Sequence, residues 1–290
     1  MKFATWIQNG KEEAGIFSKN LQSVHSFSSL GLDYKGVLDF IIRRDEAVMD
    51  KLRKAEEKDG IPASDVKPEA PIPVPHHDII CLGLNYMDHA RESARIDINA
   101  EIKREKSVYF SKRVTRALGH GGIIENHFDI NEKLDYEAEL ALVIGKDGRR
   151  IKKENVWDHV FGLMCFNDIS ARNLQHDHNQ WYFGKSLDTF TAFGPYIVTL
   201  DEFKTPLELA VRSRVNGEVR QNGNTENMIF SPEFIIEELS AGITLDAGTN
   251  ISTGTPAGVG AGFTPHRCMK TGDVCEIEVE GCGILRNTVG

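Results

Sequence analysis

Three carboxylates, Asp135, Glu137 and Glu139, occupy every second position near the start of the segment LDYEAELALVIG, residues 134–145. The segment is predicted to be a strand, in which alternate side chains point the same way, so the three would share one face. Two explanations fit such a face. It is solvated, as one face of an antiparallel strand often is, or it holds a hard divalent cation such as Mg²⁺, Mn²⁺ or Ca²⁺, which binds oxygen ligands.

Asp168 supplies a carboxylate from outside this segment, which the explanation by a bound cation needs. It ends the apolar run FGLMCFND, residues 161–168, where a predicted buried strand meets a loop. Ligands and catalytic groups are common at such positions, although an Asp there can also cap the following turn. Together with Glu137 and Glu139, Asp168 would complete a three-oxygen site for Mg²⁺ or Mn²⁺, with water or substrate in the remaining positions.

A histidine and a glutamate in CLGLNYMDHARES, residues 81–93, could perform acid–base chemistry. A predicted strand ends before a short helix, residues 86 to about 94, that carries His89 and Glu92 three positions apart. This spacing places both on one helix face, where the carboxylate can orient the imidazole as a general base. The competing interpretation is a surface helix with an incidental His–Glu pair.

Two further segments could bind an anionic substrate. Lys185, in GKSLDTFTAFGP, has small and apolar neighbours and could neutralise a negative charge, or it is an exposed lysine beside a turn. The Gly- and Thr-rich turn ISTGTPAGVG, residues 251–260, offers backbone N–H groups to a carboxylate. Glycine-rich turns are common, so this second signal is weak alone.

Three other features are set aside. The HDH at 176–178 has no cysteine partners and is a poor zinc signature. His76 and His77 follow a run of prolines and are expected to be exposed. The GHGGII near residue 119 lacks the G-K-S/T ending of a phosphate-binding loop.

The elements that must position these groups divide the chain into two parts. Residues 1–70 are predicted to form a small N-terminal α/β domain, with a strand at FATWIQ and one amphipathic helix over residues 34–60. The segment KPEAPIPVP, residues 67–75, holds four of the ten prolines, which favours an extended linker. Residues 71–290 would then form the main domain.

Short apolar runs separated by glycine dominate the second part and predict strands. Helices are fewer. The clearest is SPEFIIEELSAG, with Ser231 as N-cap, Pro232 in the first turn and Gly242 at its end. The strands do not alternate regularly with helices, which favours a β-rich α+β fold over a doubly wound sheet. The predicted strands are DIICLGL, LDYEAELALVIG, VFGLMCFNDIS, TAFGPYIVTL, LAVRSRVNG, TNISTGTP and DVCEIEVEGCGIL.

The bulk composition is that of a soluble globular protein. The 290 residues carry a formal net charge of −9 without a basic cluster, which argues against a nucleic-acid-binding protein. No apolar run approaches the roughly 20 residues of a membrane helix, and the N-terminus lacks the apolar core of a signal peptide. Five cysteines without a C-x-x-C pair favour reduced thiols and a cytoplasmic location.

Taken in order, these segments resemble the fumarylacetoacetate hydrolase family. The resemblance covers residues from about 76 to 290, and six motifs in the right order make it specific. One departure is Arg113 after Lys112, where family members often have proline, and this bears on substrate preference more than on chemistry. The matching motifs are G-x-N-Y-x-x-H-x-x-E at 83–92, YFSK at 109–112, D-Y-E-A-E-L at 135–140, N-D-I-S-A-R at 167–172, G-K-S-x-D at 184–188 and T-G-T-P-x-G-V-G at 253–260.

The resemblance implies a mixed β-sandwich or roll in the main domain, which commonly pairs as a homodimer. It also implies that Glu137, Glu139 and Asp168 bind Mg²⁺ or Mn²⁺. His89 and Glu92 would form a catalytic dyad on a mobile lid helix that orders when substrate binds.

Four more positions take roles from the resemblance. Lys185 would be catalytic and face the substrate, and Thr255 would contact the substrate carboxylate. Arg172 and Gln175 are similar to active-site neighbours and are expected to bind substrate.

The activity implied is metal-dependent hydrolysis of a C–C bond in an acylpyruvate or related 2,4-dioxo acid such as fumarylpyruvate or acetylpyruvate. His89 and Glu92 would direct a water at the distal carbonyl, and a stabilised pyruvate enolate would leave. Oxaloacetate decarboxylation, and isomerisation of a 2-hydroxyhepta-2,4-diene-1,7-dioate in aromatic catabolism, pass through the same kind of enolate and remain alternatives. A non-catalytic protein that binds dicarboxylates is a further alternative.

Overall fold

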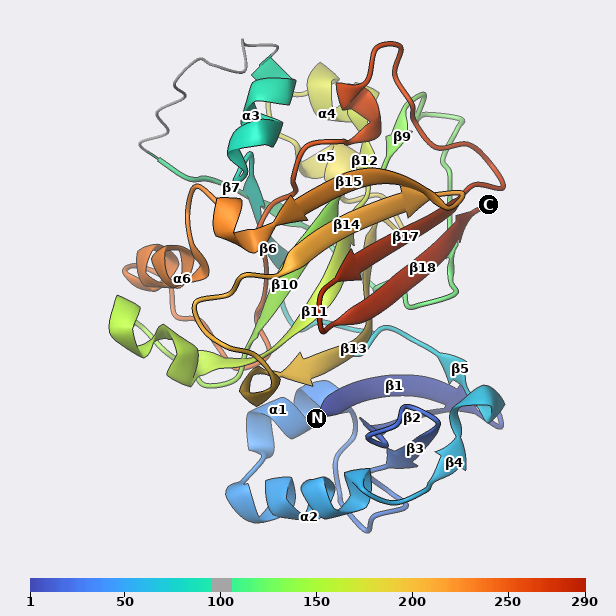
Figure 1. Ribbon diagram of the computed structural model, residues 1–290, viewed down its shortest axis with the longest axis vertical. Coiled ribbons are helices and arrows are strands. Elements are labelled where there is room, and N and C mark those ends of the chain that lie inside the picture. The colour runs from blue at the N-terminus through green and yellow to red at the C-terminus, as the bar shows by residue number, and fades with distance from the viewer. Residues whose placement is uncertain (95–105) are drawn as a thin grey trace.

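The structure, a computed structural model, describes residues 1–94 and 106–290 (Figure 1). In these residues a larger sheet of eleven strands has the order β4-β3-β2-β1-β13-β11-β10-β16-β6-β7, with β5 paired to β1. A second sheet of five strands has the order β15-β14-β17-β18-β8, and β12 pairs with β9. This strand-rich arrangement with short helices confirms the predicted α+β class.

The first part of the chain forms one end of the larger sheet. β1 also pairs with β13 (Thr191–Thr199), so the sheet runs from the N-terminal part into the main part. Ala70 and Ile72 are buried, so the proline-rich segment packs against the protein. The domain boundary expected near residue 70 stays a prediction. The strands of this part are β1 (Lys2–Gln8), β2 (Lys11–Phe17), β3 (Ser23–Ser26), β4 (Ile61–Pro62) and β5 (Lys67–Pro68).

The single helix predicted over residues 34–60 is wrong, because two helices occupy this segment. α1 (Val37–Arg43) and α2 (Glu46–Glu56) are separated by Arg44 and Asp45. The Asp45 side chain accepts a hydrogen bond from a backbone N–H in the first turn of α2. An Asp in this position caps a new helix, and the apolar pattern continues across the break because both helices bury one face.

The middle of the larger sheet brings several strand ends together. β11 (Val160–Asp168) and β16 (Asn250–Ser252) run antiparallel to β10 (Ala138–Ile144), and β6 (Ile79–Gly83) runs parallel to β16. The start of β10 and the ends of the other three strands therefore lie at the same end of the sheet. Helix α3 (Met87–Ala94) follows β6 at this end, as predicted from the sequence.

The strand predicted for residues 134–145 is interrupted. β9 (Leu134–Asp135) pairs with β12 (Ser170–Ala171), and β10 starts only after a two-residue break. Alternation of faces holds only within a continuous strand. The prediction that Asp135, Glu137 and Glu139 lie on one face of a continuous strand is therefore wrong.

The second sheet packs over one face of the larger sheet, with a shared apolar core between them. The segment DVCEIEVEGCGIL, predicted as one strand, forms the hairpin of β17 and β18, which turns at Gly281 with a φ of 80°. The opposite face of the larger sheet packs against α1 and α2. The strands of the second sheet are β8 (Ile123–Ile124), β14 (Ala210–Val215), β15 (Glu218–Asn224), β17 (Val274–Val279) and β18 (Gly283–Val289).

Helix α6 (Pro232–Ser240) begins as predicted, because the Ser231 side chain accepts a hydrogen bond from the backbone N–H of Phe234. The remaining elements near the end of the larger sheet are β7 (Val108–Lys112), α4 (Arg172–Asp177) and α5 (Tyr182–Lys185). In the described part of the chain, every helix is too short or too polar to cross a membrane.

Candidate active site

A cavity of 540 Å³ lies at the end of the larger sheet where β10 begins and β6 and β16 end. Apolar side chains from β6, β7 and the segment before α5 form one wall. The predicted site residues, apart from Asp168, all line this cavity: His89, Glu92, Glu137, Glu139, Arg172, Gln175, Lys185 and Thr255.

The three carboxylates predicted to bind a metal lie together and are called the carboxylate cluster below. One oxygen from each of Glu137, Glu139 and Asp168 lies within 4.8 Å of the other two. The residues are 5%, 1% and 1% exposed, respectively. Glu137 directly precedes β10, Glu139 lies within it, and Asp168 ends the neighbouring β11, so the pairing of these two strands sets their spacing.

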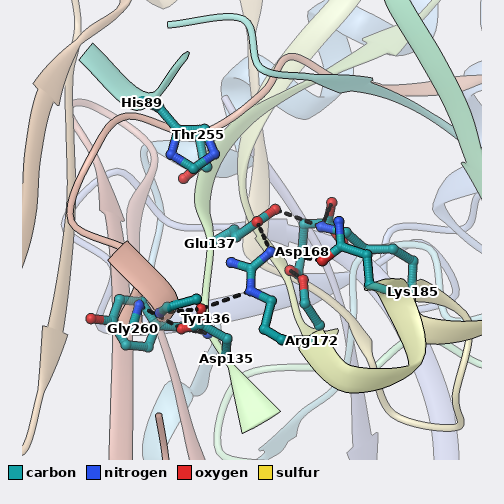
Figure 2. A network of polar contacts seen from close by, with 12 residues as sticks. His89, Asp135, Tyr136, Glu137, Asp168, Arg172, Lys185, Thr255 and Gly260 are labelled. Carbon is teal, nitrogen blue, oxygen red and sulfur yellow. Dashed lines mark hydrogen bonds and ion pairs between the residues drawn. The ribbon is translucent and has the colours of Figure 1, made fainter. Parts of the chain in front are cut away.

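Three buried cations contact two of these carboxylates, as Figure 2 shows for two of them. Lys185 donates to Glu137 at 2.6 Å and to Asp168 at 2.8 Å. Arg172 lies 2.7 Å from Glu137, and Lys112 donates to Asp168 at 2.5 Å. Burial opposes ionisation of Glu137, but Lys185 and Arg172 outweigh it and hold the pKa of that carboxyl well below its usual range. Lys185 is thus not an exposed lysine, and the Asp168 carboxylate does not cap a turn.

Glu139 forms no ion pair with any residue that the structure describes. Its Oε2 accepts hydrogen bonds from the hydroxyl of Ser252 and from the N–H of Gly254, the latter at 2.9 Å. Burial, together with the carboxylates of Asp168 and Glu137, raises the pKa of Glu139 well above its usual value. The cluster therefore contains one buried carboxylate that lacks a counter-charge.

The donor set fits Mg²⁺ or Mn²⁺. These hard ions prefer carboxylate oxygens and keep several positions for water or substrate. Four carboxylates, the cluster and Asp135, face the three cations Lys112, Arg172 and Lys185, so with every group ionised four charges minus three leave one negative charge. A divalent ion would neutralise this charge and leave a positive one for an anionic substrate.

His89 and Glu92 form the predicted pair on α3. Nδ1 of His89 lies 3.0 Å from Oε2 of Glu92, and His89 is 6% exposed. An ionised carboxylate only accepts hydrogen bonds, so the proton sits on Nδ1 and Nε2 is the basic nitrogen. The other oxygen of Glu92 accepts a hydrogen bond from the N–H of Gly258 at 3.0 Å. His89 is buried, Glu92 is half-buried and both are anchored, which an incidental surface pair would not be.

The predicted substrate-binding residues line the cavity, and Thr255 and Gln175 form hydrogen bonds with other groups of the protein. The Thr255 hydroxyl donates to the carbonyl of Ala138 at 2.8 Å and accepts from Gln221 at 2.7 Å. A substrate carboxylate would compete with that carbonyl for the hydroxyl hydrogen, so this contact stays a prediction. Gln175 accepts from Nη1 of Arg172 at 3.0 Å, whereas Nη2 of Arg172 is buried without a hydrogen-bond partner among the described residues.

Lys112 is a site residue that sequence reasoning missed. It is fully buried and donates to Asp168 and to the carbonyl of Ile169, the latter at 3.0 Å. Burial lowers the pKa of Lys112, while Asp168 acts in the opposite direction. The signal available was a lysine at the end of the apolar run in YFSK. Arg113 donates its backbone N–H to Ser186 at 3.1 Å, a bond that proline could not make.

A second group of possible ligands lies away from the cavity. Ligand atoms of His76, His77 and Asp246 lie within 4.8 Å of one another, and His77 is 3.1 Å from Asp246. Both histidines are exposed, as predicted from the sequence.

The sequence and the fold are similar to those of known proteins. Residues 78–290 match the family described as Fumarylacetoacetate (FAA) hydrolase C-terminal. The chain is 48% identical over 227 residues to oxaloacetate tautomerase YisK of Bacillus subtilis, covering 78% of this chain and 74% of that protein.

Two solved structures have the same fold over nearly their whole length. Fumarylacetoacetate hydrolase (EaFAH) from Exiguobacterium antarcticum is 37% identical with a TM-score of 0.83, covering 100% of this chain and 99% of that one. The 5-carboxymethyl-2-hydroxymuconate delta-isomerase from Mycobacterium smegmatis is 26% identical with a TM-score of 0.75, with the same two coverages.

Proposed function

The chain belongs to the fumarylacetoacetate hydrolase family, and on that premise we propose that it interconverts the keto and enol forms of oxaloacetate or a similar 2-oxo dicarboxylate. The identity of 48% to an oxaloacetate tautomerase supports this proposal. The observation that carries it is one cavity lined by the His89–Glu92 pair and by Glu137 and Glu139 of the carboxylate cluster. Proton transfer beside a carbonyl needs a base and a stabilised enolate oxygen, and these are the groups that supply them.

Tautomerisation is not among the activities predicted from the sequence, but it uses the same enolate. Nε2 of His89 takes a proton from C3 of the keto form. The C–H electron pair becomes the C2=C3 double bond, and the carbonyl pair moves onto the C2 oxygen. The C2 oxygen of the enolate then takes a proton from water to give the enol. In the other direction the enol O–H gives its proton to water, and His89 returns a proton to C3. Glu92 keeps the imidazole oriented for both steps and stabilises its cationic form.

Lys185 is placed to stabilise charge on the substrate oxygen. An ammonium has three hydrogens, and Lys185 uses two of them for Glu137 and Asp168. These carboxylates outweigh the effect of burial and raise its pKa, so it stays cationic. The third hydrogen is available to the enolate oxygen or to a substrate carboxylate.

A divalent cation held by Glu137, Glu139 and Asp168 would act as a Lewis acid toward the 2-oxo group. We propose Mg²⁺ or Mn²⁺ for this role, since the donors are all carboxylate oxygens. Arg172 contributes a further anchor, because its buried Nη2 has no hydrogen-bond partner among the described residues and suits a carboxylate.

The decay of enol-oxaloacetate absorbance tests this function. Protein loaded with Mn²⁺ or Mg²⁺ is expected to accelerate the decay, and EDTA is expected to abolish the acceleration. His89→Gln is expected to lower kcat about 100-fold or more. The matched control is His159→Gln, since among the described residues the His159 side chain bonds only the carbonyl of Lys146, outside the cavity. Metal-loaded wild-type protein that leaves the decay unchanged contradicts the proposed function.

Hydrolysis of a C–C bond in an acylpyruvate is the second candidate. The observation that favours it is the His–Glu pair, which can activate water as well as a C–H bond. The similar structure from Exiguobacterium antarcticum is a fumarylacetoacetate hydrolase. Two further assays on the same preparations separate these activities from tautomerisation. Cleavage of acetylpyruvate or fumarylpyruvate reports hydrolysis. Release of pyruvate from oxaloacetate reports decarboxylation.

Isomerisation of a hydroxymuconate-type substrate remains a further alternative, in line with the isomerase from Mycobacterium smegmatis. A homodimer and a cytoplasmic location also remain proposals. The free thiols of all five cysteines agree with a reducing compartment. Saturable oxalate binding without turnover of any of these oxo acids would favour a non-catalytic binding protein instead.

A further inference from the structure

Figure 2 shows Asp135 beside Gly260 and Tyr136, with a dashed contact to Arg172. Asp135 is fully buried, and one carboxylate oxygen accepts hydrogen bonds from the N–H groups of Tyr136 at 2.9 Å and Gly260 at 2.7 Å. The other oxygen accepts from the N–H of Ala261 at 2.9 Å and from Nε of Arg172 at 2.8 Å. Four donors satisfy the carboxylate, so Asp135 holds its neighbours rather than a ligand.

One connection leads from Asp135 to the carboxylate cluster. Arg172 uses Nε for Asp135 and Nη1 for Glu137, at 2.8 Å and 2.7 Å. A guanidinium is planar and its donors have a fixed fork geometry. The bond to Asp135 therefore sets the direction in which Arg172 meets Glu137.

A second connection leads from Asp135 to the His–Glu pair. Asp135 holds two backbone N–H groups of the turn formed by residues 258–262. At the start of this turn, Gly258 donates to Glu92 at 3.0 Å. Glu92 in turn holds Nδ1 of His89, so the turn joins Asp135 to helix α3.

Two glycines show how tightly the turn is packed between the two carboxylates. A Cβ at Gly260 would lie 2.5 Å from Oδ1 of Asp135, and a Cβ at Gly262 would lie 2.1 Å from Oε1 of Glu92. Both distances are shorter than real Cβ contacts, so neither glycine could carry a side chain unless a carboxylate moved. Such contiguous packing transmits a displacement from one side to the other.

From these contacts we propose that Asp135 is a positioning residue that couples cation binding at the carboxylate cluster to the docking of helix α3. The coupling rests on the proposed function for the cation and the base, but not on the identity of the substrate. Coupling between two sites is reciprocal. Docking of α3 strengthens cation binding, and cation binding stabilises the docked α3 by the same free energy.

A double-mutant cycle on Mn²⁺ affinity, measured by isothermal titration calorimetry, tests this coupling. Glu92→Gln weakens the anchor of α3 and is expected to weaken Mn²⁺ binding about fivefold, although Glu92 is not in the carboxylate cluster. In an Asp135→Asn background, the same substitution is expected to have no further effect. Mn²⁺ is also expected to slow hydrogen exchange in residues 87–94 of the wild type, but not of Asp135→Asn.

The controls separate coupling from loss of structure. All variants carry His77→Ala, so that the group of His76, His77 and Asp246 does not contribute to binding. Asp147→Asn is the matched control, because Asp147 also accepts a backbone N–H, from Ala247 at 2.7 Å, outside the cavity. If Asp135→Asn does not fold, Gly260→Ala takes its place with the same expected pattern.

The coupling is overturned if Glu92→Gln leaves Mn²⁺ affinity unchanged, or weakens it equally in both backgrounds. An Asp135 that is only structural gives this second result, with a lower unfolding temperature. If the double-mutant cycle shows coupling but the protein fails the tautomerase assay, only the proposed activity is overturned. A wild type that binds no Mn²⁺ contradicts both.

Discussion

Glu137 and Glu139 are two residues apart and face opposite electrostatic environments. Lys185 and Arg172 contact Glu137, whereas Glu139 receives only hydrogen bonds and lies beside two other carboxylates. Proteins keep such unfavourable charges at functional sites because a ligand compensates for them. The two residues should therefore respond differently to the same substitution.

At a pH where Glu139 is ionised, Glu139→Gln is expected to stabilise the metal-free protein by about 1 kcal/mol, because an amide removes a buried charge without a partner and can still accept both hydrogen bonds. Glu137→Gln is expected to destabilise it by about 3 kcal/mol, because Lys185 and Arg172 lose a buried counter-charge. Urea unfolding in EDTA measures both. A Glu139→Gln variant that is destabilised as much as Glu137→Gln would contradict the charge assignment.

The pH dependence of stability follows from the raised pKa of Glu139. A carboxyl whose pKa is higher in the folded state than the usual 4.5 contributes stability that is present below this value and is lost as the pH rises through the folded pKa. The free energy of unfolding of the wild type, relative to Glu139→Gln, should therefore fall in EDTA as the pH rises above 4.5 and through the raised folded-state pKa of Glu139. A difference that does not change with pH would show that Glu139 is ionised without cost.

At this scale the sequence predicted the acidic residues and the dyad, because spacing along one strand or helix is visible in it. Lys112 and Asp135 were not assigned roles, because their partners come from other elements. Lys112 contacts Asp168, and Asp135 contacts Arg172 and the turn at residues 258–262.

At the scale of elements, the break between α1 and α2 shows the limit of periodicity. The apolar positions predicted one helix over residues 34–60, but Asp45 caps a second helix and Arg44 reaches the carbonyl of Gly145 at 3.0 Å. That contact joins residues 101 positions apart, which a local pattern does not contain. Caps with nearby partners, such as Ser231 of α6, were predicted correctly.

Asp45→Ala is expected to lower the free energy of unfolding by about 1 kcal/mol, because the backbone N–H of Val48 loses its cap. Asp50→Ala is the control on the same helix, since within residues 1–94 and 106–290 the Asp50 side chain bonds only the exposed Arg53. Urea unfolding compares the two variants, and Mn²⁺ affinity should be unchanged in both. Equal stability of the two variants would show that α2 does not depend on this cap.

At the scale of the whole molecule, the N-terminal part and the main part share a sheet. β1 pairs with β13, and Phe3 packs against Phe161 with ring centroids 5.2 Å apart. The composition change near residue 70 suggested two separate units, because pairing between distant strands is not visible in local composition. Figure 1 shows the strands of the first part beside β13.

Removal of residues 1–70 is expected to expose the edge of β13 and apolar side chains such as Phe161, Phe166 and Phe193. The shortened chain should therefore aggregate or bind the dye ANS, as measured by size-exclusion chromatography and fluorescence. A soluble shortened chain with the wild-type unfolding temperature would show that the shared sheet contributes little to stability.

In the proposed mechanism the carboxylate cluster holds the cation while His89 moves the proton. Mn²⁺ binding and oxaloacetate tautomerisation, measured on the same preparations of wild type, Glu139→Gln and His89→Gln, test it most directly. Glu139→Gln should lose both Mn²⁺ binding and turnover, whereas His89→Gln should keep Mn²⁺ binding within about twofold and lose turnover about 100-fold or more. Full turnover in either variant, or turnover in the wild type that EDTA does not affect, would contradict the account.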